Sequence, residues 1–161
     1  TLFDPATGLL NTPAFIQRLN QEVLRSIDFG YPMTLCLLQI DPYRSFDPEE
    51  HKERSEMAML QAVDIIQSRI RPYDLFGRAE SGVFGIALID IGIAEAKIWA
   101  EKLRTETAMS IIKIKSATFN VTISLGLAQL GKNDAIDDIL ANAKQMLKLS
   151  TMKTNSVTAF E

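Results

Sequence analysis

The sequence predicts an α+β fold in which helices flank a central, mainly antiparallel sheet of five strands. Three observations predict it. Short apolar runs alternate with amphipathic segments, two of these runs form a hairpin near the middle, and the elements follow the order α-β-α-β-β-α-β-α-β. This order favours helices packed on a largely antiparallel sheet. A chain of 161 residues supports one core, so we expect a single domain over residues 1–161.

The first half of the chain predicts a helix, a strand and a second helix. Thr12 is expected to cap the first helix, because its hydroxyl can accept from free amides and Pro13 fits the first turn. The run 33–40 is apolar nearly throughout, as in a strand covered on both faces. The second helix is expected to end before Pro72. The inward stripes of the two helices are Phe15, Ile16, Leu19, Val23 and Ile27, then Met59, Val63, Ile66 and Ile70.

The second half predicts a hairpin, a helix, a strand, a helix and a closing strand. In chain order these are 75–78 paired with 83–89, then 94–104, 119–128, 136–150 and 156–160. The segment 119–128 alternates apolar residues with small or polar ones, which predicts a strand with two unlike faces. In the third helix we expect Ala94, Ile98 and Leu103 to face inward.

Composition indicates an ordinary soluble domain. Apolar residues make up 47% of the chain, charged residues 23%, and the net charge is −3, with no basic stripe for binding nucleic acid. The only cysteine, Cys36, lies in an apolar run and is expected to be a buried hydrophobe in a reducing compartment. Because the chain starts without methionine, we expect a cytoplasmic piece of a longer multidomain protein, whose other parts can supply a membrane anchor.

Three stretches of the chain resemble the GGDEF family. Residues 4–11, Asp-Pro-Ala-Thr-Gly-Leu-Leu-Asn, are similar to its D-x-L-T-G-L-x-N phrase, and Phe15 follows at the expected distance. Residues 122–128 resemble its S-x-G-x-A strand, and residues 139–144 stand where it has an L-x-x-A-D helix. The resemblance covers essentially the whole chain. It implies the nucleotidyl cyclase palm-like fold, whose cyclase members condense two GTP molecules into cyclic di-GMP.

The same resemblance implies that this chain is a degenerate, catalytically inactive member. The family's phosphoryl transfer needs divalent metal held by carboxylates. The position of its first metal ligand, at the end of the first strand, is held by Gln39. The hairpin signature reads Glu80, Ser81, Gly82, Val83 and Phe84. Only Phe84 matches, and Gly82 stands where the second metal carboxylate is needed. We therefore expect no Mg²⁺ site and no cyclase activity.

Other nucleotide contacts are also altered. The positions of the family's basic pair for the triphosphate are Ser150 and Thr154, neither of which is basic. Lys148 and Lys153 lie close to them. The positions aligned with the family's base-recognition residues are held by Asp47 and Glu56.

A product-binding pattern of the family, R-x-x-D, survives. The pattern begins at Arg71, nine residues ahead of Glu80 as the resemblance requires, and ends at Asp74. A guanidinium suits phosphate or guanine, and a carboxylate can accept from guanine nitrogens. The resemblance thus implies cyclic di-GMP binding at Arg71 and Asp74, with Lys102 and Arg104 as candidate contributors from a neighbouring protomer or domain. The alternative is that Arg71 caps a helix end and Asp74 begins a turn.

Three functions therefore remain open at this point. The first is an inactive regulatory domain that binds cyclic di-GMP and relays the signal to attached domains or a partner protein. The second is a ligand-free scaffold for dimerisation or protein interaction. The third is a GTP-binding or weakly active cyclase domain.

Overall fold

Five strands form the central sheet in the order β2-β3-β1-β6-β7. They are β1 (Met33–Ile40), β2 (Leu75–Glu80), β3 (Val83–Ile89), β6 (Ile123–Gln129) and β7 (Ser156–Ala159). β1 lies in the middle and pairs antiparallel with β3 and β6, whereas β7 runs parallel to β6. This computed structural model describes residues 1–42, 48–114 and 117–161. The mainly antiparallel five-stranded sheet confirms the predicted fold class.

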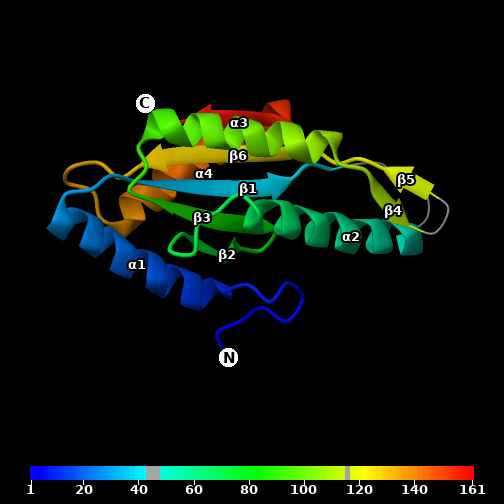
Figure 1. The fold of residues 1–161 in the computed structure, drawn as a ribbon, viewed down its shortest axis with the longest axis horizontal. Coiled ribbons are helices and arrows are strands. Elements are labelled where there is room, and N and C mark those ends of the chain that lie inside the picture. Colours follow the sequence, from blue (N-terminus) through cyan, green and yellow to red (C-terminus); the bar gives the residue numbers. More distant parts are fainter. Residues whose placement is uncertain (43–47, 115–116) are drawn as a thin grey trace.

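Helices cover both faces of the sheet. α1 (Thr12–Phe29) and α4 (Ile136–Lys153) pack on one face, and α2 (Pro48–Gln67) and α3 (Ile93–Met109) on the other. Figure 1 shows α2 and α3 in front of the strands and α4 behind them. Successive side chains of a strand point to opposite faces. Leu35 and Leu37 accordingly pack with α1 and α4, and Cys36 and Leu38 pack with α2 and α3. The continuous apolar run of β1 reflects burial on both sides.

Two facing glycines seat α1 against the hairpin. Gly77 of β2 pairs with Gly85 of β3. A Cβ at Gly77 would lie 2.8 Å from the Phe15 ring, and one at Gly85 would lie 2.5 Å from it. Such contacts are closer than side chains tolerate, so Phe15, which is fully buried, occupies space that only two glycines leave open.

A small second sheet was not predicted. It pairs β4 (Ile112–Ile114) with β5 (Ala117–Phe119). The predicted strand 119–128 is therefore wrong in its first four residues, because Phe119 belongs to β5 and the main-sheet strand begins at Ile123. Between them, the Asn120 side chain donates to the carbonyls of Ala108 and Ser110, which ties this connection to the end of α3.

The helices differ from prediction in detail. The cap of α1 is Asn11, whose side chain accepts from the Ala14 amide, and Thr12 is the first helical residue. α2 ends at Gln67, before the predicted end. Ile27, Ala94 and Ile98 were predicted to face inward but are exposed, whereas Leu103 is buried as predicted. The other buried residues of α3 are Ala96, Ala100 and Thr107. No helix among the described residues is long and apolar enough to cross a membrane.

Cys36 is expected to be chemically inert in the folded domain. It is fully buried beneath α2 and α3, and this burial raises the pKa of its thiol above the ordinary value. Only the thiolate reacts readily, and it becomes accessible only on opening. We expect DTNB to label the native chain at least ~100-fold more slowly than the unfolded chain. Equal labelling rates would contradict the burial of β1.

Candidate functional site

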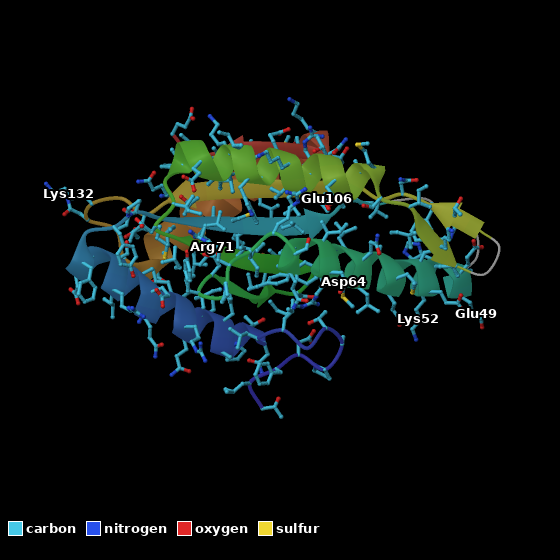
Figure 2. The ribbon with its side chains drawn as sticks, viewed as in Figure 1. Glu49, Lys52, Asp64, Arg71, Glu106 and Lys132 are labelled. Atoms are coloured by element: carbon cyan, nitrogen blue, oxygen red, sulfur yellow. The ribbon has the colours of Figure 1, made fainter. Side chains whose placement is uncertain are left out.

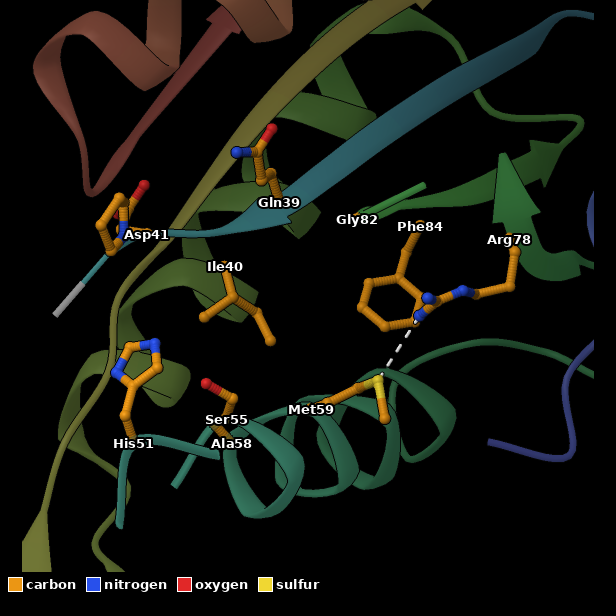
Figure 3. A pocket seen from close by; sticks show the side chains of 11 residues that line it. Gln39, Ile40, Asp41, His51, Ser55, Ala58, Met59, Arg78, Gly82 and Phe84 are labelled. Carbon is orange, nitrogen blue, oxygen red and sulfur yellow. Dashed lines mark hydrogen bonds between the residues drawn. The ribbon is translucent and has the colours of Figure 1, made fainter. Parts of the chain in front are cut away.

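A cavity of about 350 Å³ lies between the C-terminal end of β1, the hairpin and the first turns of α2. Gln39 and Asp41 line one side, Gly82 and Phe84 of the hairpin line another, and Met59 of α2 closes the cavity from below in Figure 3. Gln39 and Gly82, at which the resemblance implies missing metal carboxylates, thus line one cavity. One provides a neutral amide and the other has no side chain.

Asp41 is the only carboxylate among the described residues that line this cavity. Its oxygens accept from Thr122 Oγ1 at 2.6 Å, Ser124 Oγ at 2.5 Å and the Asn155 amide at 2.7 Å. The residue is 4% exposed. Its charge is therefore stabilised by three donors from the protein itself.

Arg78 is a cavity residue that sequence reasoning missed. It pairs directly with Phe84 across the hairpin, and its guanidinium lies 4.8 Å from the centre of the Phe84 ring. Its Nη1 donates to Met59 Sδ at 3.5 Å, which is the dashed line in Figure 3. The sequence feature that could have identified Arg78 is its position as the one charged residue in the predicted strand 75–78, which is otherwise apolar. The cavity therefore combines a cation, an aromatic ring and an apolar floor, a lining suited to a flat, electron-rich group.

A second groove, of about 530 Å³, lies between the hairpin and α4. Lys144 and Lys148 line this groove. Gln39 lines both the groove and the first cavity. Lys144 Nζ lies 3.0 Å from Glu80 Oε2, so the first residue of the degenerate signature forms an ion pair with α4. Lys144 was not identified from the sequence, because its approach to the hairpin depends on how α4 packs.

The two positions aligned with the family's basic pair do not reach this groove. Ser150 is buried, where its hydroxyl donates to the Leu125 carbonyl, and Thr154 forms the C-terminal cap of α4. Of the two lysines predicted to lie near them, Lys148 lines the groove. The other, Lys153, is exposed on the last turn of α4.

The turn of the hairpin contains only Ser81 and Gly82, because β2 extends through Glu80. Gly82 has φ +76°, a left-handed conformation that favours glycine. Val83 is buried on the face of the sheet covered by α1 and α4. Gly82 therefore serves the turn conformation at a position where the family places an acid.

Arg71 and Asp74 form a closely bonded pair at the opposite end of the sheet. Arg71 donates through Nε and Nη2 to the Asp74 carboxylate, at 3.1 and 2.8 Å, and through Nη2 to the Ile89 carbonyl at 2.6 Å. Asp74 also accepts from the amides of Arg71 and Ile89. The Arg71 side chain is 36% exposed and that of Asp74 only 1%. Asp74 thus lies beneath Arg71, with its oxygens already used inside the protein.

Asp74 and Tyr73 hold the guanidinium group of Arg71 in one orientation. The hydrogen bond to Asp74 raises the pKa of the Arg71 guanidinium above its ordinary value. Tyr73, which is largely exposed, stacks on the guanidinium at 4.6 Å from its ring centre. An arginine held by a carboxylate and an aromatic ring keeps a set orientation at the surface, as recognition of a planar or anionic group requires.

Lys102 and Arg104 lie at different distances from this pair. Glu106 of α3, labelled with Arg71 in Figure 2, forms an ion pair with Arg69, which follows the end of α2. This pair serves as a reference point for Lys102 on the same helix. Lys102 is exposed one turn before Glu106, on the side of α3 that reaches the end of α2. Arg104 instead bonds Glu101 and Asn155. Asn155 contacts Asp41, beyond the far end of β1, and the eight residues of β1 span about 26 Å. Arg104 therefore does not join Arg71 within one chain.

Of the two residues aligned with base recognition, the structure describes only Glu56. Asp47 lies outside the described residues. Glu56 is exposed on α2 and is not part of the cavity lining, whereas its neighbour Ser55 is. His51 also lines the cavity, from the first turn of α2.

Residues 1–155 match one protein family. A model described as "Diguanylate cyclase, GGDEF domain" matches residues 1–155. The diguanylate cyclase DgcP of Pseudomonas aeruginosa is 26% identical over 146 residues, which cover 91% of this chain and 22% of that protein. This chain therefore spans about a fifth of the length of that relative.

Solved structures agree with the match. The GGDEF domain of DgcB from Caulobacter crescentus, in complex with c-di-GMP, has a TM-score of 0.90 at 20% identity and covers 98% of this chain and 92% of its own. The diguanylate cyclase SiaD of P. aeruginosa, in complex with its activator SiaC, has a TM-score of 0.90 at 20% identity, over 99% of this chain and 62% of its own. These likenesses show the fold, and with the family match over residues 1–155 they establish that the chain belongs to the GGDEF domain family.

Proposed function

We propose that this chain is a regulatory GGDEF domain that does not synthesise cyclic di-GMP but binds it at Arg71. The observation that carries the proposal is the set of side chains at the cavity where the family needs acids. Gln39 is neutral, Gly82 has no side chain, and the carboxylate of Asp41 is bonded to Thr122, Ser124 and Asn155.

These residues do not fit a two-metal site. Mg²⁺ prefers oxygen ligands in strict octahedral geometry and is held through carboxylates. Three donors of the protein already bond the Asp41 carboxylate, so it offers at most one ligand position beside the neutral amide of Gln39 and the glycine at position 82. We therefore expect no catalytic step that runs through a metal at this cavity.

The surface at Arg71 supports recognition of cyclic di-GMP, but Arg71 and Asp74 have different roles from those expected from the sequence. The bonds to Asp74 and Ile89 use Nε and Nη2 of Arg71, while part of the side chain remains exposed beside Tyr73. Arg71 is thus the residue that contacts a guanine or a phosphate. Asp74 is a positioning residue, because its carboxylate is buried. Lys102 is exposed on α3 and remains a candidate contributor of positive charge.

The inactivity is tested by incubating the chain with GTP and Mg²⁺ or Mn²⁺ and measuring cyclic di-GMP by chromatography. We expect no product above the protein-free background, because at least two of the required carboxylates are missing. DgcP serves as the positive control. Turnover that disappears on Asp41→Asn or Glu56→Gln would contradict the proposal.

The binding is tested by calorimetric titration of the unmodified chain with cyclic di-GMP. We expect a saturable heat. If no heat is measured at high micromolar cyclic di-GMP, the proposed binding is wrong, and the ligand-free scaffold for dimerisation or protein interaction remains. In that case the oligomeric state and the binding of attached domains should be unchanged by Arg71→Ala.

A second candidate function is guanine nucleotide binding without turnover. The cavity itself favours it, since Arg78, Phe84 and Met59 provide a cation, a ring and an apolar floor, and the adjoining groove holds Lys144 and Lys148. The two ligands are distinguished by substitution. Arg78→Ala should weaken GTP binding and spare cyclic di-GMP, whereas Arg71→Ala should do the opposite.

A further inference from the structure

Asp41 joins three segments that are far apart in the chain. It follows the last residue of β1, and its amide donates to the Thr122 carbonyl at 2.9 Å. Its side chain accepts from Thr122 and Ser124, at the start of β6, and from the Asn155 amide, between α4 and β7. One buried carboxylate thus connects the centre of the sheet with the entry to its C-terminal edge strand.

The connection that Asp41 holds is conformationally strained. Thr154 has φ 61° and ψ 160°, a region populated almost only by glycine, and Asn155 follows with φ 44°. Asparagine tolerates a left-handed conformation, but a β-branched threonine does so rarely. Two such residues in succession persist only when neighbouring interactions hold them. The hydrogen bond from the Asn155 amide to Asp41 is one such interaction, and the bond from the Thr154 amide to the Ser150 carbonyl is another.

β7 is a short strand at the edge of the sheet, where Val157 and Ala159 pack against the core. It is four residues long, half-buried and at the edge of the sheet, where it pairs only with β6. Its remaining attachments include the 2.6 Å bond between the hydroxyls of Ser150 and Thr158 and the bond from the Phe160 amide to the Leu127 carbonyl. A short, half-buried edge strand opens more readily than the fully buried centre of a sheet.

We propose that the bond between the Asp41 carboxylate and the Asn155 amide is a latch that holds β7 on the sheet against the strain at Thr154 and Asn155. When the latch is broken, residues 154–160 detach while the remaining four strands stay paired. Because Asp41 also lines the cavity at the end of β1, the latch connects that cavity with the C-terminal strand. This inference needs no ligand at Arg71, so it stands or fails independently of the proposed function.

The latch is tested by hydrogen exchange of the whole chain. Asp41→Asn places an amide group among three donors, so we expect the amides of residues 156–160 to exchange about 10- to 100-fold faster, as the loss of one charged hydrogen bond implies. The amides of β1 and β3 should change much less. The matched control is Asp134→Asn, which also removes a carboxylate that accepts from a backbone amide, that of Gly131 at 2.7 Å, on another loop. It should leave β7 unchanged.

A second variant acts in the opposite direction. Thr154→Gly relieves the unfavourable backbone conformation and keeps the latch, so exchange in β7 should slow by about threefold or more. If Asp41→Asn fails to fold, Ser124→Ala removes one donor to the carboxylate and should accelerate the same amides by a smaller factor. The proposal is overturned if loss of the carboxylate or of this donor accelerates all strands equally or leaves β7 unaffected. It is also overturned if Thr154→Gly speeds exchange in β7.

Discussion

Replacing Arg71 by alanine is expected to weaken cyclic di-GMP binding by about 100-fold, the loss that follows when a charged, two-bond contact is removed. The structure gives the reason. The guanidinium is oriented by Asp74 and Ile89 from within and by Tyr73 at the surface, so its ligand-facing side needs little ordering on binding. Calorimetry on the wild-type chain and the variant measures the change directly.

Two further measurements distinguish a loss of ligand binding from a loss of folding stability. Arg71→Ala leaves the buried Asp74 with two amide donors, those of residue 71 and Ile89, so we expect the free energy of unfolding to fall by only about 1–2 kcal/mol. Arg71→Lys keeps the charge and loses the planar fork, and it should still weaken binding at least ~10-fold. In the structure Arg71 does not cap α2, which ends at Gln67, but bonds Asp74 and the Ile89 carbonyl. Wild-type affinity in both variants would mean that Arg71 has only this structural role and that the ligand, if bound, lies elsewhere.

The main strands were predictable because their patterns are strong and local. β1 is a continuous apolar run, and most of β6 alternates without error. The strands β4 and β5 were missed because three residues are too few to show a period. In α3 the prediction of Leu103 as inward is confirmed, but Ala94 and Ile98 are exposed, and the helix turns Ala96 and Ala100 to the core instead. Small residues give a weak hydrophobic signal, and only the close approach of α3 to the sheet reveals them as core positions.

The candidate site was predictable only where residue identity decides the chemistry. The resemblance implies missing acids at Gln39 and Gly82 from residue identity alone, and the structure places both residues on one cavity. The engagement of Asp41 was not visible, since its partner Asn155 lies 114 residues away. The spacing of Arg71 and Asp74 predicted a pair, but not that Asp74 is buried beneath the arginine. Such roles depend on long-range packing.

The largest loss of stability is expected from Gly126→Ala. Gly126 lies in β6, opposite Leu37 of β1, on the face that carries α4. A Cβ there would lie 2.1 Å from the Leu147 nitrogen and 2.5 Å from the Ala143 oxygen. Both atoms are backbone of α4, one helical turn apart, so no side-chain rotation relieves the clash. We expect the free energy of unfolding to fall by about 3 kcal/mol or more.

Gly126→Ala should disturb the groove between the hairpin and α4 as well as the core. To accept the methyl group, α4 must move away from the sheet, which loosens the packing of Ile139, Ala143 and Leu147 against β1 and α1. The same helix carries Lys144 to Glu80. Gly92→Ala is the matched control, because its Cβ would meet only the flexible end of Gln129, at 3.3 Å, and should cost less than about 1 kcal/mol. Equal denaturation midpoints for the two variants would contradict the close seating of α4 on β6. An intact Glu80–Lys144 pair in Gly126→Ala would instead show that the helix pivots about its first turns.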